Sequence, residues 1–135
     1  MTAAACAAWL SRMFKSVHPV CPVTDMGASL AFWARLGFAV AFADRDPPET
    51  ADYAGVARDG LELHLQTFTP EQRAGTQTMA IRIEMTGRAA LEALHGEWAP
   101  HGMITAELAD KPWGTREFGF YDPDGTPFFF YVDRS

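Results

Sequence analysis

The chain has 135 residues, of which 48% are hydrophobic, 13% aromatic and 21% charged. This length fits one domain, or two small modules that share a core, and it excludes a second independent domain. The apolar content is too high for a disordered chain and is sufficient for a buried core. The formal net charge of −6 argues against nucleic-acid binding and favours a cationic ligand.

The cysteines and the N-terminal stretch predict a cytoplasmic protein. Cys6 and Cys21 lie in no CxxC motif and beside no histidine cluster, so we expect reduced thiols and no disulfide framework or zinc knuckle. The opening MTAAACAAWL has no basic residue before its apolar run, and Arg12 and Lys15 follow it. We therefore interpret residues 1–15 as an N-terminal arm and not as a signal peptide. No stretch is long enough to cross a membrane, so no membrane partner is expected.

The first half of the chain predicts the element order βαβββ. Pro19 and Pro22 interrupt a β-branched run, which suits an edge strand or an arm. Met26, Leu30 and Trp33 then recur at helical spacing. The predicted elements are a strand over Val17–Val23, a helix between a capping Thr24 or Asp25 and Gly37, and strands over Phe38–Ala43, Tyr53–Arg58 and Leu61–Thr67.

The second half repeats this order after a polar linker over Thr67–Gln77. Thr86 is expected to cap a helix that Pro100 and Gly102 end. The predicted elements are a strand over Thr78–Met85, a helix with the apolar face Ala90, Leu91, Leu94 and Trp98, and strands over Met103–Leu108, Arg116–Tyr121 and Pro127–Val132.

The repeat predicts an α+β fold of two tandem βαβββ modules. Equivalent points at His18 and Thr78 are 60 residues apart. We expect one domain over residues 16–135, with module one at 16–67 and module two at 78–133. Two four-stranded sheets set edge to edge, with their helices outside, are expected to form a curved half-barrel with a concave inner surface.

The third predicted strand of module one indicates which side chains line that surface. Residues along a strand alternate between its faces, so its leucines are expected to pack on the helix. Glu62, His64 and Gln66 then point the other way, into the cavity. An ordinary amphipathic strand with these polar residues in solvent is an equally open interpretation.

Aromatic and acidic residues gather in one stretch of module one. Phe42 and Tyr53 lie among acidic residues, with Arg45 and Arg58 as the cations of the stretch. Aromatic faces and carboxylates together suit a planar cation, whereas the alternative is a solvated acidic loop. The acidic residues are Asp44, Asp46, Glu49, Asp52, Asp59 and Glu62.

Trp113 is a further candidate for the ligand site. Pro112 and Gly114 flank it, which favours a loop position over the alternative of a core residue.

The sequence resembles the vicinal-oxygen-chelate superfamily over roughly Ser16 to Asp133. The resemblance is carried by the duplicated βαβββ order, the segment DMGASLAFWARLGF and the ending DPDGTPFFF. This superfamily includes glyoxalase I, extradiol dioxygenases, fosfomycin-resistance transferases and bleomycin-binding resistance proteins.

The resemblance implies where a metal would bind in an enzyme of this superfamily. His18 and Glu62 match the ligand positions of module one, whereas Thr78 and Phe129 occupy those of module two and are poor or impossible ligands. We therefore expect no metal and no cofactor, with His18 as a packed or exposed arm residue. The alternative is a metal-dependent glyoxalase-type lyase or isomerase that uses His18 and Glu62. Metal-free catalysis with Glu62 or His64 as general base is a third interpretation.

Three stretches are similar to the bleomycin-binding proteins: SVHPV, YAGVARDGLEL and PWGTREFGFYDPDG. This similarity implies a homodimer that exchanges N-terminal arms at Pro19, and a non-catalytic protein that sequesters a bleomycin-like aromatic cationic antibiotic. The expected ligand-binding residues are Phe42, Tyr53, Glu62, His64 and Trp113.

Overall fold

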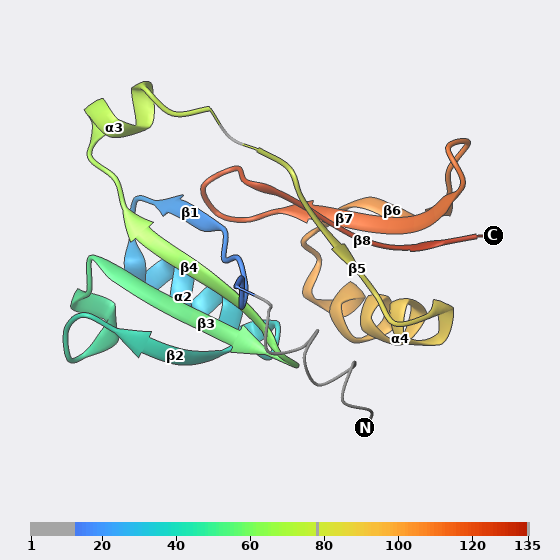
Figure 1. Cartoon of the computed structure of the whole chain (residues 1–135), viewed down its shortest axis with the longest axis horizontal. Helices are drawn as coiled ribbons and strands as arrows, with labels where there is room; N and C mark the ends of the chain where they lie inside the picture. The colour runs from blue at the N-terminus through green and yellow to red at the C-terminus, as the bar shows by residue number, and fades with distance from the viewer. Residues whose placement is uncertain (1–12, 78, 135) are drawn as a thin grey trace.

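A computed structural model describes residues 13–77 and 79–134. The described strands form two four-stranded sheets, in the orders β1-β4-β3-β2 and β5-β8-β7-β6. In each sheet the first strand of the module pairs in parallel with the last, and the remaining pairs are antiparallel. The α+β fold of two βαβββ modules is therefore confirmed (Figure 1).

The first module contains β1 (Val20–Val23), α2 (Met26–Arg35), β2 (Ala39–Ala43), the short 3-10 helix η1 (Pro48–Thr50), β3 (Tyr53–Arg58) and β4 (Leu61–Thr67). Helix α3 (Pro70–Ala74) lies between the modules. The second module contains β5 (Ile81–Glu84), α4 (Arg88–Trp98), the 3-10 helix η2 (Ala99–His101), β6 (Ile104–Asp110), β7 (Thr115–Tyr121) and β8 (Pro127–Asp133).

The ends of α2 follow from local chemistry. The Asp25 carboxylate accepts a hydrogen bond from the backbone N–H of Ala28 at 3.1 Å, so Asp25 is the N-cap. Thr24 instead donates its hydroxyl and its backbone N–H to Asp124 of the second module. Gly37 follows the helix with φ of +86°, a conformation that disfavours residues with a Cβ.

Four sequence predictions differ from the structure. Strand β5 covers only Ile81–Glu84 of the predicted Thr78–Met85. Strand β1 begins only at Val20, although the Pro19 carbonyl one residue earlier still accepts the N–H of His64. The cap predicted at Thr86 is wrong, since α4 begins after Gly87, which provides no side-chain hydrogen bond. The linker contains α3, a helix that a reciprocal capping box between Thr69 and Gln72 stabilises.

One core holds the two modules together. The Trp33 ring on α2 lies edge-on to Phe128 of β8, with centroids 4.9 Å apart, and also contacts Phe120 of β7. Trp98 on α4 donates its indole N–H to the Leu36 carbonyl at 3.2 Å. Truncating a buried tryptophan to alanine typically costs about 3–5 kcal/mol, so these two residues are major contributors to module docking.

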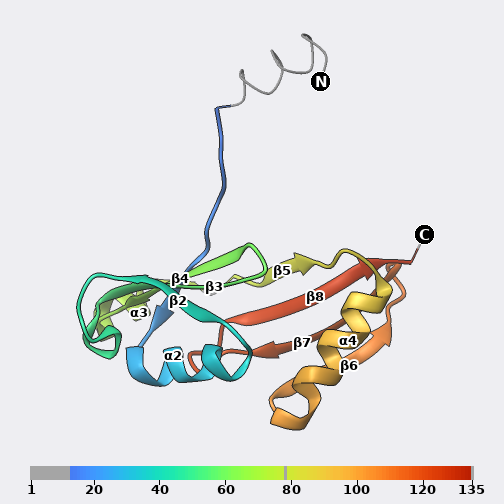
Figure 2. The ribbon, with the colours of Figure 1, turned by 90° about the horizontal axis from the view of Figure 1, so that it is seen from below.

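The helices leave one side of the molecule uncovered. Figure 2 shows α2 and α4 on the same side of the two sheets, while the chain before β1 extends away on the opposite side. The side chains of Met13, Phe14 and Val17 on this segment are exposed. Most of the predicted arm, residues 1–12, lies outside the described residues.

Cys21 is a buried free thiol on β1. Burial, with a smaller effect from Asp122, raises its pKa to about 12, so it stays protonated. Cys6 lies outside the described residues. Over residues 13–77 and 79–134, none of the helices has the length and apolar character needed to cross a membrane.

Candidate functional site

Strand β4 separates the core from the face without helices. Leu63 and Leu65 are fully buried against the core, as the alternation predicts. The side chains of Glu62 and His64, on the opposite face, are only 31% and 17% exposed. They are therefore packed in a cluster and are not free in solvent.

Tyr53, His64 and Glu62 form a hydrogen-bonded chain across β3 and β4. His64 Nε2 lies 2.8 Å from a Glu62 carboxylate oxygen, and His64 Nδ1 lies 2.8 Å from the Tyr53 hydroxyl. Because an ionised carboxylate only accepts, His64 donates from Nε2, and a neutral imidazole then accepts the Tyr53 proton at Nδ1. The hydrogen bond from His64 lowers the pKa of Glu62, so Glu62 is ionised at neutral pH.

His18 joins this cluster from the segment just before β1. Its ring stacks on His64, with centroids 4.7 Å apart and planes 9° from parallel. His18 Nδ1 lies 3.0 Å from the Glu62 backbone carbonyl. The His18 side chain is 31% exposed, so it is partly buried against His64 and Glu62.

His18, Glu62 and His64 are chemically suited to a divalent transition metal. One ligand atom from each lies within 4.8 Å of the others. The positions expected to complete a site from module two do not fit a cation: the Phe129 ring lies near the Arg82 guanidinium, and Thr78 lies outside the described residues. The donors that the structure brings together all belong to module one.

Aromatic rings form a wall beside these donors. Phe42 on β2 stacks with Tyr53 at 6.0 Å between centroids and meets the His64 ring edge-on at 5.1 Å. Gly55, opposite Phe42 in the pairing of β2 and β3, makes this possible, because a Cβ there would collide with the phenyl ring. Phe42 is 40% exposed, so its ring is available to a ligand.

The corresponding face of module two contains a fixed charge pair. Glu117 is buried and accepts hydrogen bonds from Arg82 at 2.9 Å and from the Thr115 hydroxyl at 2.7 Å. Burial opposes the ionisation of Glu117, but these hydrogen bonds outweigh burial and hold its pKa below the usual value. The Arg82 guanidinium also lies 4.4 Å from the centroid of the Tyr131 ring.

Trp113 lies in the loop between β6 and β7, as its flanking residues predict. It is 63% exposed, and its indole N–H points to Glu117 at 3.5 Å. The structure therefore brings Phe42, Tyr53, Glu62 and His64 together on module one and places Trp113 on module two.

Most of the acidic stretch lies in the loop between β2 and β3 and does not reach this cluster. Asp44 accepts the backbone N–H of Asp52, and Asp52 pairs with Arg45. Asp59 is exposed in the β3–β4 turn. Glu62 differs from these acidic residues because it is hydrogen-bonded to His64, whose ring lies against Phe42 and Tyr53.

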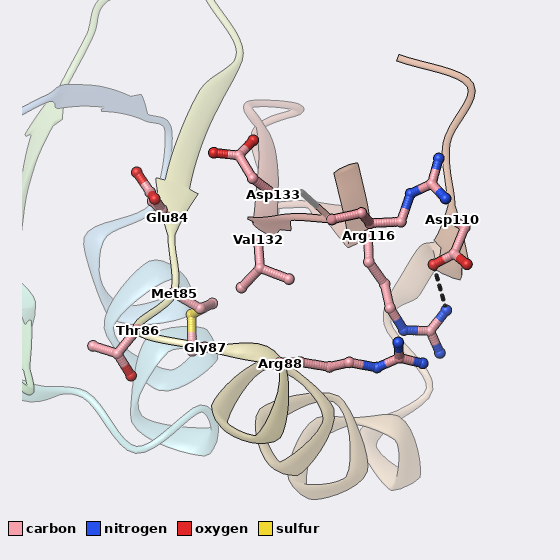
Figure 3. A pocket seen from close by; sticks show the side chains of 10 residues that line it. Glu84, Met85, Thr86, Gly87, Arg88, Asp110, Arg116, Val132 and Asp133 are labelled. Atoms are coloured by element: carbon pink, nitrogen blue, oxygen red, sulfur yellow. Dashed lines mark hydrogen bonds and ion pairs between the residues drawn. The ribbon is translucent and has the colours of Figure 1, made fainter. Parts of the chain in front are cut away.

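Two hollows of the described chain lie away from these residues. One, of about 460 Å³, lies beside the start of α4, where Arg88 and Arg116 face Asp110 (Figure 3). The other, of about 410 Å³, is lined mostly by apolar side chains such as Leu61, Met85 and Leu94.

Comparison with known proteins places this chain in a family. The sequence signature of the Glyoxalase/Bleomycin resistance protein/Dioxygenase superfamily matches residues 15–130. The chain belongs to this superfamily. No match is found among curated protein sequences.

Solved structures with the same fold include bleomycin-binding proteins. The bleomycin resistance determinant encoded on the transposon Tn5 has a TM-score of 0.70 at 20% identity, covering 90% of this chain and 100% of that one. The bleomycin-binding protein from bleomycin-producing Streptomyces verticillus, complexed with copper(II)-bleomycin, has a TM-score of 0.62 at 28% identity, covering 91% and 99%. A glyoxalase/bleomycin resistance protein/dioxygenase from Alicyclobacillus acidocaldarius has a TM-score of 0.71 at 16% identity, covering 90% and 92%.

Sequence reasoning missed the residues that support the predicted ones. Gly55 leaves room for the Phe42 ring to pack against the sheet. The Glu117 carboxylate accepts hydrogen bonds from both Arg82 and Trp113. A glycine inside a predicted strand indicates a close approach of another group, and this indication was available at Gly55. The pairing of Arg82 with Glu117 has no comparable sequence pattern, because 35 residues separate them.

Proposed function

We propose that the chain is a non-catalytic protein that sequesters a bleomycin-like aromatic cationic antibiotic. The observation that carries this proposal is the juxtaposition of the Phe42 and Tyr53 rings with the ionised Glu62 carboxylate on an accessible face. A planar cation gains from stacking on aromatic rings and from a nearby negative charge. Such contacts contribute about 2 kcal/mol each when they are desolvated.

The second module supplies complementary support. The exposed Trp113 indole offers a further flat surface, and its hydrogen bond to Glu117 orients it. Glu117 also neutralises Arg82, whereas the Lys111 ammonium lies 5.9 Å from the centroid of the Trp113 ring, where a cationic ligand would have to displace it. The similarity to the Streptomyces verticillus bleomycin-binding protein supports the same ligand class.

We propose further that the protein acts as an arm-exchanged homodimer. A single chain leaves the faces of both modules open, and its Met13 and Phe14 side chains extend into solvent with 87% and 93% exposure. Large exposed apolar groups favour burial against another surface. Exchange of residues 1–15 at Pro19 would place the module-one face of one protomer opposite the module-two face of its partner. Residues 16–135 would form the domain.

The chemistry of this face and the acidic charge support a small molecule as the partner, with neither nucleic acid nor membrane as a target. Cytoplasmic location belongs to the same proposal.

Calorimetric titration with bleomycin tests the ligand proposal. We expect saturable binding to the wild-type protein and about tenfold or greater weakening in Phe42→Ala and in Trp113→Ala, because each removes one stacking surface. His101→Ala, an exposed ring on η2, is the matched control and should bind like wild type. Equal affinity in all four proteins, or no binding by the wild type, would contradict the proposal.

A metal-dependent lyase or isomerase of the glyoxalase type is the second candidate. The observation in its favour is the grouping of His18, Glu62 and His64 within reach of one ion. A bound divalent ion would supply Lewis-acid polarisation of a substrate oxygen. Elemental analysis of the purified protein separates the two candidates: a stoichiometric divalent ion, together with turnover that a chelator abolishes, would establish the lyase and exclude the binder.

A further inference from the structure

Lys111 and Trp113 contact each other within the loop between β6 and β7. Lys111 directly follows β6, and Trp113 comes two residues later. The Lys111 Nζ atom lies 5.9 Å from the centroid of the Trp113 ring. This separation is within the distance of about 6 Å at which an aromatic ring attracts a cation. The protein therefore places a cation of its own on a ring that is a candidate stacking surface for the ligand.

The loop that holds this contact is fixed by main-chain hydrogen bonds. The Lys111 N–H donates to the Thr115 carbonyl at 2.7 Å. The Lys111 carbonyl accepts the Gly114 N–H at 3.0 Å and the Arg134 guanidinium at 2.7 Å. None of these bonds uses the Lys111 side chain, so a substitution that removes its charge leaves them in place.

Carboxylates near Lys111 in the chain are paired with other cations. Asp110, the preceding residue, and Glu117, the next acidic residue along the chain, each bind an arginine. Of the ion pairs found over residues 13–77 and 79–134, none includes Lys111. The Lys111 ammonium therefore adds a positive charge at Trp113 that no carboxylate of the described chain offsets.

The aromatic rings of module one are in a different electrostatic environment. The cation–π contacts of the described residues include neither Phe42 nor Tyr53. The ionised Glu62 carboxylate belongs to their cluster instead. A cationic ligand would thus find a negative charge beside Phe42 and a positive charge beside Trp113.

We propose that Lys111 is a specificity-determining residue, whose ammonium competes with the positive charge of the ligand for the Trp113 ring. A cation at this ring has to displace the ammonium or stack on the opposite face of the indole. Repulsion between like charges opposes both arrangements, whereas an uncharged planar group meets no such repulsion. This inference rests on the proposed binding function and defines the charge selectivity of the same site.

Calorimetry on the full chain tests the inference with two planar probes of similar shape. N-methylacridinium is a permanent cation, and acridine is uncharged in mildly alkaline buffer. Lys111→Met retains a long unbranched side chain without the charge. We expect it to bind N-methylacridinium and bleomycin about 3- to 10-fold more tightly than wild type, with acridine affinity changed by about twofold or less. A gain of affinity cannot result from misfolding.

Salt provides a second readout of the same effect. Repulsion between exposed charges is screened by dissolved ions, so the gain in Lys111→Met should shrink as NaCl rises from about 0.02 to 0.5 M. Loss of a merely structural side chain would not produce this dependence.

Two control variants separate the local contact from the net charge. Lys111→Arg keeps a cation beside Trp113 and should bind N-methylacridinium like wild type. Arg35→Met removes one exposed positive charge from the last turn of α2, on the helix-covered side of the molecule (Figure 2), and should also bind like wild type.

Nuclear magnetic resonance detects the contact independently of ligand affinity. Lys15 and Lys111 are the two lysines of the chain. Reductive methylation with ¹³C-formaldehyde retains their charge and gives one dimethylamino signal for each, besides that of the N-terminal amine. We expect Trp113→Leu to move the Lys111 signal, because the ring current of the indole is lost, and N-methylacridinium to move the same signal in the wild type.

The failures of the two proposals are distinguishable. Equal affinity of wild type and Lys111→Met for the cationic ligands, or a Lys111 signal that Trp113→Leu leaves in place, would overturn the Lys111 inference while the binding function stands. Binding of cations by Lys111→Met alone would support the inference and contradict the proposed function of the wild type. Absence of binding by every protein to both probes and to bleomycin would overturn both proposals.

Discussion

The imidazole rings of His18 and His64 are stacked 4.7 Å apart, although the first lies in the segment before β1 and the second in the middle of β4. The parallel pairing of β1 with β4 explains this contact, since it sets Val20 opposite His64 and brings the preceding residues over the same face. The stack fixes His18 beside the Glu62 carboxylate. Together with the 3.0 Å contact between His18 Nδ1 and the Glu62 carbonyl, it joins the segment before β1 to the candidate site.

Removal of the arm should dissociate the proposed dimer. In a chain that begins at Ser16, the exposed apolar side chains of Met13 and Phe14 are lost, and burial of each such side chain contributes about 1.5–3 kcal/mol. We expect the wild type to sediment as a dimer and the truncated chain as a monomer or as aggregates. Sedimentation velocity across a range of concentrations measures this.

A full-length Met13→Ser/Phe14→Ser variant controls for chain length. It should shift toward monomer in the same direction as the truncation. A dimer of unchanged size and stability in both proteins would rule out the arm exchange.

The two strand glycines should differ in their sensitivity to alanine. A Cβ at Gly119 would lie 2.6 Å from the Phe128 carbonyl oxygen, which belongs to the backbone and cannot move aside. At Gly55 the obstacle is the Phe42 ring, which can rotate away. We expect Gly119→Ala to lower the free energy of unfolding by about 1–3 kcal/mol, and Gly55→Ala to lower it less while weakening ligand binding.

Gly96→Ala provides the matched control for these substitutions. Gly96 lies inside α4 with open space around it, so alanine should raise the free energy of unfolding by up to about 1 kcal/mol. Urea unfolding of the three variants gives the comparison. If Gly55→Ala proved more destabilising than Gly119→Ala, the packing explanation would be wrong.

Asp122 should lower the free energy of unfolding as pH rises. Most carboxylates of folded proteins have the opposite effect, because their pKa is lowered by folding. Burial raises the pKa of Asp122 above its usual value, although its carboxylate accepts backbone N–H groups from Asp124 and Thr126. Because the folded state holds this proton to higher pH than the unfolded state, stability falls as pH rises from the unfolded pKa through the folded one.

Asp122→Asn removes this titration while it retains an oxygen acceptor. The free energy of unfolding of the variant should therefore rise relative to that of wild type between pH 4 and pH 7. Asp59→Asn, at an exposed carboxylate, is the control. Urea unfolding at both pH values measures the difference, and a difference that does not change with pH would refute the effect.

Local patterns in the sequence were enough to predict the strands and the main helix of each module, and their order along the chain. Asp25, Gly37 and the spacing of the apolar residues of α2 act within a few residues of each other, so they could be read without knowledge of the fold. The errors at Thr86 and in the linker are also local, since α4 has its N-cap one residue later, at Gly87, and α3 has its N-cap at Thr69 inside the linker. The alternation along β4 likewise assigned Glu62 and His64 to the face opposite the core.

The sequence by itself determined two βαβββ modules, an apolar core and a first module rich in aromatic and acidic side chains, because helix capping and strand periodicity depend on neighbouring residues. Only the tertiary structure decided that His18 stacks on His64, that Glu117 fixes Arg82, and that Trp113 donates its indole N–H to Glu117. These relationships depend on strand pairing and module docking, which bring together residues that are distant in the chain and leave no periodic trace in the sequence.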